Sequence, residues 1–181
     1  CRRGNVRRVG LRVALFTGVQ IMNQFRIGSG YDAHRFAEGR PLILCGVTIP
    51  YDRGLAGHSD ADAAAHALTD ALLGALALGD IGKMFPDTDE RFRGADSIVL
   101  LKQAFARPEF AEWSISNIDI TIVAQRPKIS PFTAAMRERI AEALGIAVDQ
   151  ISIKGKTTEG MGFCGRGEGV ETYATVLLER K

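Results

Sequence analysis

The sequence is poor in cysteine and contains no long apolar run. Its three cysteines, Cys1, Cys45 and Cys164, include no pair with CxxC spacing. They favour free thiols in a reducing compartment over a disulfide framework. No apolar run approaches the ~20 residues of a membrane-spanning helix, so we expect a cytoplasmic protein without a membrane partner.

The first 25 residues lack acidic side chains and carry five arginines, whereas the rest of the chain holds 18 basic and 21 acidic residues. The body therefore has a net charge of −3, which argues against nucleic acid as a partner. Residues 1–21 are Arg-rich and acid-poor like a transit peptide, but they contain no serine. We interpret them as an N-terminal extension, added artificially or translated upstream of a natural start at Met22. Genuine targeting, to a plastid for example, is the second interpretation.

All three histidines lie in one stretch, at His34, His58 and His66, and each has carboxylates nearby. Asp32 and His34 are two residues apart, so on an extended chain their side chains point to the same face. Imidazole nitrogen and carboxylate oxygen are both good zinc ligands, and three protein ligands leave a position open for substrate. We therefore predict a Zn²⁺ site formed by Asp32, His34 and His66. The alternative is three unrelated polar residues.

The apolar pattern predicts an α/β domain of the α+β layered kind over residues 22–181, with helices packed on one face of a mixed β-sheet. The expected elements are a strand over 26–31 that ends at Asp32, a hairpin over 42–49, a helix over 61–78 capped by Ser59 or Asp60, a loop over 79–89, a helix from 97 to about 106 capped by Asp96 or Ser97, a strand over 118–122, a helix over 131–144 that ends at Gly145, and strands over 151–153 and 170–178.

Two further segments have the composition of phosphate sites. His58 and Ser59 precede the helix over 61–78, whose N-terminal N–H groups and dipole favour an anion, although a plain helix cap is the alternative. The Gly-rich segment 156–169 offers hydroxyls, backbone amides and an arginine for phosphoryl oxygens. In the same segment Glu159 can ligate Mg²⁺. A flexible turn is the alternative there.

Two acids of the helix over 61–78 share a face with the predicted zinc ligand His66, because Asp62, His66 and Asp70 recur every four residues. Asp62 or Asp70 can orient an imidazole that binds zinc, whereas a helix cap and a solvated face are the alternatives. Residues 124–128 follow a predicted strand and can present backbone groups to a nucleobase. A structural strand exit explains them equally well.

Taken together, these segments resemble the 2-C-methyl-D-erythritol 2,4-cyclodiphosphate synthase family of the non-mevalonate isoprenoid pathway. The resemblance covers residues 26–181. It rests on the segments 26–36 (RIGSGYDAHRF), 56–62 (AGHSDAD), 66–70 (HALTD), 79–89 (GDIGKMFPDTD), 124–128 (AQRPK), 157–159 (TTE) and 162–169 (GFCGRGEG).

The resemblance implies a metal-dependent phosphorus–oxygen lyase. It would convert 4-diphosphocytidyl-2-C-methyl-D-erythritol 2-phosphate to the 2,4-cyclodiphosphate and CMP, by attack of the 2-phosphate on the β-phosphorus of the same molecule. It also implies a homotrimer with active sites at the subunit interfaces. Positioning a nucleophile and an electrophile can be worth ~7–11 kcal/mol, so no protein nucleophile is needed.

The resemblance assigns site residues one by one. Asp32, His34 and His66 would bind Zn²⁺, Glu159 would hold Mg²⁺ or Mn²⁺ between the substrate phosphates, and His58 and Thr157 would stabilise the transition state. Substrate contacts would come from Ser59, Asp80, Ile81, Gly82, Phe85, Asp87, Thr88, Asp89, Ala124, Gln125, Arg126, Pro127, Lys128, Ile129, Ser130, Lys156, Thr158, Phe163 and Arg166. Two of these, Phe163 and Arg166, match residues near the trimer axis.

One position departs from the family pattern. Lys156 stands where some members have a threonine, which puts the detail of the nucleotide pocket in doubt but not the reaction. Two other functions compete with the cyclase. A zinc-dependent phosphohydrolase would use the same Asp-His-His site with a water nucleophile and give a linear product. A non-catalytic domain stabilised by zinc would need a closed four-ligand site, whereas the sequence offers three ligands.

Overall fold

The computed structural model describes residues 24–181. The expectations for residues 1–21 and for Met22 lie outside this range. In the described part no helix has both the length and the apolar content needed to cross a membrane.

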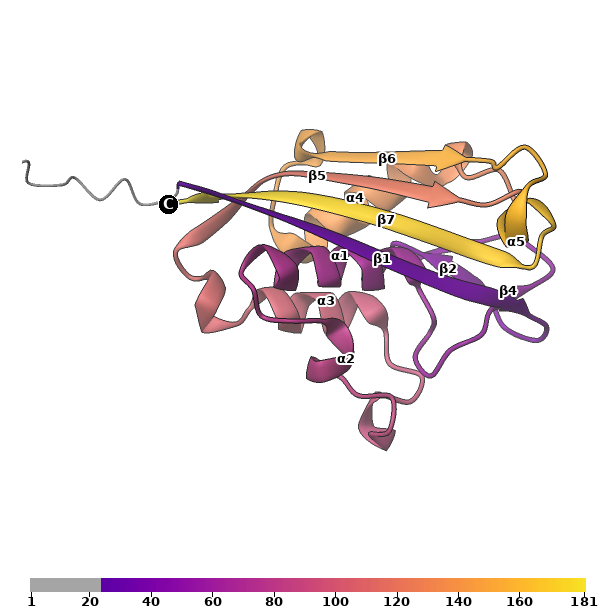
Figure 1. The fold of residues 1–181 in the computed structure, drawn as a ribbon, viewed down its shortest axis with the longest axis horizontal. Helices are drawn as coiled ribbons and strands as arrows, with labels where there is room; N and C mark the ends of the chain where they lie inside the picture. Colours follow the sequence, from indigo (N-terminus) through magenta and orange to yellow (C-terminus); the bar gives the residue numbers. More distant parts are fainter. Residues whose placement is uncertain (1–23) are drawn as a thin grey trace, which may run out of the picture.

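A five-stranded mixed sheet forms one layer of the molecule, with the strand order β4-β1-β7-β5-β6 (Figure 1). Its two long central strands, β1 (Phe25–Ala37) and β7 (Gly169–Arg180), pair antiparallel along most of their length. β7 also pairs antiparallel with β5 (Trp113–Val123), while β5 and β6 (Ile151–Lys156) are parallel. Parallel strands need a crossover, and α4 (Thr133–Leu144) supplies it between β5 and β6.

The helices α1 (Ala63–Ala75) and α4 pack on one face of this sheet, and α3 (Ser97–Phe105) packs against both helices on the same side (Figure 1). Their apolar sides and the inward residues of β5, β6 and β7 form one buried cluster that includes Leu68, Leu72 and Ile120. The predicted layered fold, with helices on one face of a mixed sheet, is confirmed. The remaining elements are β2 (Leu42–Leu44), β3 (Val47–Ile49), β4 (Gly54–Leu55), α2 (Ile81–Met84), α5 (Gly162–Gly165) and four 3₁₀ turns at Glu90–Phe92, Pro108–Phe110, Ser130–Phe132 and Val148–Gln150.

Two glycines on β1 set how closely α1 approaches the sheet. A Cβ atom at Gly28 would lie 1.9 Å from the carbonyl oxygen of Ala71, and one at Gly30 would lie 1.9 Å from that of Ala67. Only a residue without a side chain allows such an approach of two backbones. The strand that carries Asp32 and His34 is thereby held directly against the helix that carries His66.

Two predicted boundaries are wrong near the site. The first strand does not end at Asp32 but continues to Ala37, because β7 supplies backbone partners as far as Arg35. The first helix begins at Ala63, two residues later than predicted, and its cap is Asp62, not Ser59 or Asp60. The second helix follows the prediction, with Asp96 as its cap. The Gly-rich segment contains the one-turn helix α5 in addition to loop.

Candidate functional site

The three predicted zinc ligands lie together between β1 and α1. Asp32 Oδ2 is 3.0 Å from His34 Nδ1 and 3.0 Å from His66 Nδ1, and the three candidate ligand atoms lie within 4.8 Å of one another. Asp32 and His34 share a face of β1, as their spacing predicts, and His66 comes from the first turns of α1. His34 Nδ1 is buried and makes no hydrogen bond of good geometry. A buried nitrogen without a hydrogen-bond partner beside a carboxylate fits a metal ligand.

The charges at this cluster match the same chemistry. Burial alone would raise the pKa of Asp32, but the neighbouring imidazoles of His34 and His66 lower it to about 2. The pKa of His66 is raised: burial lowers it, and the hydrogen bond and charge of Asp32 more than offset that. The carboxylate is therefore ionised at neutral pH and available to a cation, which is the state that a metal ligand needs.

The second ring nitrogen of His66 contacts two serines. His66 Nε2 lies 2.9 Å from Ser97 Oγ and 3.2 Å from Ser59 Oγ. Ser97 in turn donates its hydroxyl hydrogen to Asp60 Oδ1 and its backbone N–H to Asp60 Oδ2, at 3.1 Å. Neither Ser97 nor Asp60 was predicted to take part in the site.

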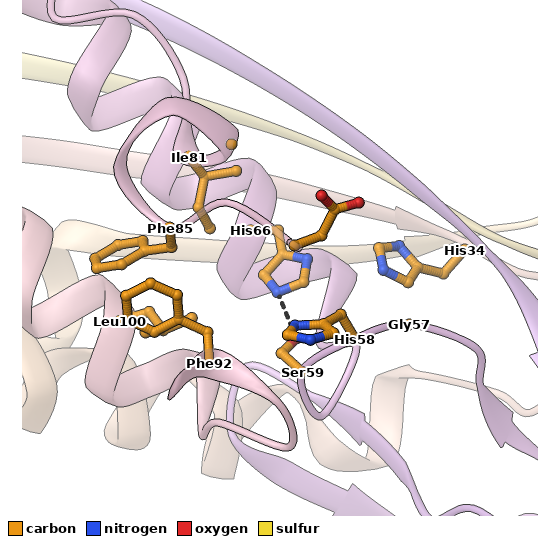
Figure 2. A pocket seen from close by; sticks show the side chains of 11 residues that line it. His34, Gly57, His58, Ser59, His66, Ile81, Phe85, Phe92 and Leu100 are labelled. Atoms are coloured by element: carbon orange, nitrogen blue, oxygen red, sulfur yellow. Dashed lines mark hydrogen bonds between the residues drawn. The ribbon is translucent and has the colours of Figure 1, made fainter. Parts of the chain in front are cut away.

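A cavity of about 430 Å³ opens beside this cluster (Figure 2). Its polar end holds the imidazoles of His34, His58 and His66 together with Ser59, and its other end is apolar. The full lining is His34, Gly57, His58, Ser59, His66, Ile81, Gly82, Phe85, Asp87, Phe92 and Leu100. A pocket with one ionic end and one apolar end suits a phosphorylated molecule with a small hydrocarbon part.

Two of the apolar lining residues, Phe92 and Leu100, were not predicted. Phe92 packs edge-on against the predicted Phe85, with ring centroids 5.2 Å apart. Leu100 reaches the cavity from α3. Apolar residues carry no chemical signal in a sequence, so only the fold identifies them as part of the lining.

Arg40 holds the loop that carries His58 and Ser59. Its guanidinium donates to the carbonyl oxygen of Gly57 at 2.7 Å and to that of Ser59 at 2.5 Å. His58 Nε2 is buried and has no hydrogen-bond partner. Since a buried imidazole nitrogen is costly to leave unpaired, this orientation indicates a ligand group in the cavity.

A second hollow, of about 120 Å³, lies at the ends of β5 and β6. Most of the predicted nucleobase segment lines it, and no acidic residue does. The lining residues are Ala124, Gln125, Pro127, Lys128, Ile129, Ser130, Gly155, Lys156 and Thr157. Its lining shares no residue with the first cavity, so one chain presents two separate parts of the predicted site.

Several predicted residues line neither hollow. Asp80 caps α2, Asp89 pairs with Arg91, and Arg166 pairs with Glu168. The others are Asp32, Thr88, Arg126, Thr158, Glu159 and Phe163. The structure puts Phe163 in a third hollow of about 260 Å³ with Ala33, His34, Arg35 and Glu168.

Glu159 has a backbone shape that is unusual for its residue type. Its φ angle is +52°, in the left-handed region, and its carboxylate accepts a hydrogen bond of 2.5 Å from the hydroxyl of Thr157. A side chain other than glycine in this region costs conformational energy. The arrangement places the predicted Mg²⁺ ligand beside the predicted phosphate-binding threonine.

The two helix acids that were offered as partners for an imidazole have other roles. Asp62 is fully buried and accepts backbone hydrogen bonds from Ala64 and Ala65, as the cap of α1, and from Cys45 and Gly46 in the β2–β3 turn. Burial raises its pKa to about 6, and these bonds offset part of that shift. Asp70 accepts from the backbone of Ile81 at 2.7 Å, at the start of α2. Both therefore act as anchors for the backbone.

Comparisons with known proteins agree on one family. A family profile described as the YgbB family matches residues 25–179. The 2-C-methyl-D-erythritol 2,4-cyclodiphosphate synthase of Paraburkholderia xenovorans is 58% identical over 156 residues, which cover 86% of this chain and 98% of that protein. The synthase of Moorella thermoacetica is 59% identical over 153 residues, 84% of this chain and 94% of that protein.

Solved structures give the same result. A structure of 2C-methyl-D-erythritol-2,4-cyclodiphosphate synthase in a form with bound CDP matches with a TM-score of 0.77 and 44% identity, over 85% of this chain and 100% of that chain. The bifunctional IspDF of Campylobacter jejuni matches with a TM-score of 0.83 and 46% identity over 87% of this chain, which spans 42% of that longer protein. With the profile matching nearly all of the described residues, the chain belongs to the YgbB family.

Proposed function

We propose that this protein is a 2-C-methyl-D-erythritol 2,4-cyclodiphosphate synthase. It converts 4-diphosphocytidyl-2-C-methyl-D-erythritol 2-phosphate to the cyclic diphosphate and releases CMP. The observation that carries the proposal is the cluster of Asp32, His34 and His66 at the ionic end of a 430 Å³ cavity, in a chain of this family. The relatives named above are synthases of this kind.

In the reaction, an oxygen of the 2-phosphate forms a bond to the β-phosphorus, and the bond from that phosphorus to the oxygen that bridges to the α-phosphate breaks. That bridging oxygen leaves on CMP with its electron pair. Because both reacting groups belong to one molecule, the protein folds the substrate and balances its charge, which is the positioning effect worth ~7–11 kcal/mol. The described residues accordingly supply donors and cations around the phosphates.

His58 and Ser59 hold phosphoryl oxygens in this proposal. The buried Nε2 of His58 has no protein partner, and Arg40 fixes the loop that carries both side chains. The Ile81–Phe85 segment and Phe92 enclose the methylerythritol part, with an apolar surface that suits its methyl group. The packed rings of Phe85 and Phe92 form part of that apolar end.

Zn²⁺ is the metal that we propose for the Asp32, His34 and His66 cluster, since one carboxylate and two imidazoles are a ligand set typical of an open zinc site. Mg²⁺ or Mn²⁺ is proposed at Glu159, whose single exposed carboxylate suits an ion that keeps most of its contacts with phosphate and water. Bound cations of this kind polarise phosphoryl oxygens and neutralise charge that develops in the transition state.

The nucleotide belongs in the second hollow in this proposal. Residues 124–130 offer backbone groups to the cytosine, and Lys128 and Lys156 add positive charge in a lining without an acid. Lys156, the departure from the family pattern, then lies near the phosphate of the departing CMP. The CDP-bound synthase structure is consistent with a cytidine ligand for this fold.

A homotrimer completes the site. Two observations support it: the two hollows of one chain share no lining residue, and exposed apolar side chains lie on the outer face of β1 and β7. On that face Ile27 is 71% exposed, and Tyr31 and Tyr173 are 49% and 47% exposed with ring centroids 5.1 Å apart. Contact between copies through this face would bury these side chains and bring a cavity of one copy toward the nucleotide hollow of another.

The compartment that we propose is the cytoplasm, and the reaction class is a metal-dependent lyase. Cys45 and Cys164 are both free and buried, which fits a reducing environment. Burial beside Asp62 raises the pKa of the Cys45 thiol, so it is unreactive at neutral pH.

The test is incubation with the cytidyl substrate, with and without chelator, following CMP and the product mass. A cyclic product that needs metal supports the proposal. A linear diphosphate that carries one added water would establish the phosphohydrolase in its place. The His66→Ala protein should stay folded, lose zinc and lose turnover, whereas full activity in metal-stripped buffer would refute the metal assignment. If the His34→Ala protein unfolds, zinc is structural and the non-catalytic alternative gains support.

A further inference from the structure

The hydrogen bonds around His66 determine which of its ring nitrogens carries a proton. Nδ1 faces Asp32, whereas Nε2 faces Ser97 Oγ at 2.9 Å. A neutral imidazole has one N–H and one lone pair. Whichever nitrogen holds the lone pair is the one that can bind a metal.

Ser97 is the group that decides between them. A carboxylate accepts hydrogen bonds only, so the hydroxyl hydrogen of Ser97 is donated to Asp60. A hydroxyl has a single hydrogen, and therefore Ser97 Oγ can meet His66 Nε2 only as an acceptor. Nε2 must therefore carry a proton. Nδ1 donates its own hydrogen to Asp32 in the metal-free protein, and a metal that binds between Asp32 and His34 takes the place of that Nδ1 proton while Nε2 keeps its proton.

The geometry points to Ser97, fixed by Asp60, as a positioning residue that keeps His66 in the tautomer able to bind the catalytic metal. The inference rests on the metal site of the proposed function, and it adds two residues outside that site. Outer hydrogen-bond partners of this kind set ring orientation and basicity in metal sites generally.

Ser97 is held firmly enough for this role. It is 1% exposed, and it is the first residue of α3, where Asp96 caps the helix through the backbone of Ile98 at 2.8 Å. Asp60 is itself anchored by a backbone bond to Ala95 at 3.1 Å and takes both the N–H and the hydroxyl of Ser97. The serine hydroxyl therefore has no freedom to turn its hydrogen toward the imidazole.

The same arrangement leaves the hydroxyl of Ser59 available. Ser59 Oγ accepts the N–H of Ala61 at 3.1 Å and lies 3.2 Å from His66 Nε2. With the proton on Nε2, Ser59 has no need to donate to the ring, and its own hydrogen remains for a phosphoryl oxygen in the cavity. One proton position thus prepares the metal ligand and a phosphate donor together.

The test measures Zn²⁺ affinity of the full chain by competition with a chromophoric chelator, without substrate. Ser97→Ala should weaken Zn²⁺ binding by about 10–100-fold, the usual cost of losing an outer partner of a metal ligand. The matched control is Thr69→Val. Thr69 is buried on α1, the helix that carries His66, and its hydroxyl donates to the backbone carbonyl oxygen of Ala65 on that helix, at 2.8 Å. This control should keep its Zn²⁺ affinity within twofold. Circular dichroism confirms that both variants are folded.

A second measurement uses the unmodified protein and does not depend on a variant folding. With ¹⁵N-labelled histidine the spectrum holds only three imidazoles. In the Zn²⁺-loaded protein, His66 should show a protonated Nε2 and an unprotonated Nδ1, and the Ser97→Ala protein should lose this preference.

A bare Nε2 in the Zn²⁺-loaded unmodified protein, or a Ser97→Ala protein with undiminished Zn²⁺ affinity, would overturn the inference. Neither readout involves turnover. An inactive protein that binds Zn²⁺ as described would therefore refute the proposed function and leave this inference standing.

Discussion

Gly30→Ala tests whether close packing of β1 on α1 creates the metal site. A Cβ atom at this position would lie 1.9 Å from the carbonyl oxygen of Ala67 and 2.8 Å from the backbone nitrogen of Ala71. An ordinary contact needs about 3.4 Å, so helix and strand must separate by about 1.5 Å. Because the obstructing atoms belong to a helix backbone, no side-chain rotation relieves the clash. His66, next to Ala67, moves away from Asp32 with the helix.

The expected cost is at the upper end of overpacking, about 3 kcal/mol or more. For a domain of this size that lowers the melting temperature by roughly 6–12 °C. Zn²⁺ affinity should fall as well, since a displacement of this size breaks the ligand geometry. Scanning calorimetry and chelator competition measure the two effects.

Gly74→Ala is the matched control, a glycine of α1 whose added Cβ would find its nearest neighbour at 3.8 Å, the carbonyl oxygen of Ser29. Alanine within a helix should stabilise the protein by about 0.5–1 kcal/mol and leave Zn²⁺ binding unchanged. A Gly30→Ala protein that melts like the unmodified one and binds Zn²⁺ equally well would show that the close approach does not matter for the site.

Three further predictions follow from the site. Glu159→Gln should reduce turnover and weaken its dependence on Mg²⁺, and an unchanged Mg²⁺ titration would rule out that ligand. Arg40→Met should lower kcat by about tenfold or more without loss of zinc, because the carbonyl groups of Gly57 and Ser59 lose their clamp; steady-state kinetics with a zinc assay would expose an error. Zn²⁺ affinity should fall by about tenfold per pH unit below the pKa of His66. Burial lowers the pKa of His66, but the Asp32 carboxylate beside the ring raises it by more, so the net shift is upward. The loss of Zn²⁺ affinity should therefore begin above the ordinary pKa of histidine, and an affinity that stays constant from pH 8 to 6 would contradict the prediction.

That Asp32 and His34 lie side by side could be predicted because the signal is local. Asp32 and His34 are two residues apart on a strand, and that spacing alone places them on one face. The contact of His66 with these two residues depends on tertiary packing, because α1 must cross β1 at Gly30. The alternation of apolar and polar residues does not specify where a helix crosses a strand. The clustering of the three histidines beside acids suggested this contact, and the family resemblance supported it.

Ser97 and Asp60 show what local reading cannot find. They are 37 residues apart, and each has an ordinary explanation as a helix cap, so neither is conspicuous in the sequence. For Asp62 the sequence pattern predicts a contact that the structure does not contain. Its spacing places it on the same helical face as His66, but its carboxylate points to the β2–β3 turn. A helical face predicts direction only when the residue lies within the helix, and Asp62 is the cap.

The metal ligands come from two elements, Asp32 and His34 from β1 and His66 from α1. An unfolded chain does not hold these groups together, so the ion binds the folded state selectively and mass action couples occupancy to folding. At a free zinc concentration a thousand times the Kd, this linkage is worth about 4 kcal/mol. With zinc as the proposed ion, zinc depletion should therefore lower the free energy of unfolding as well as the activity.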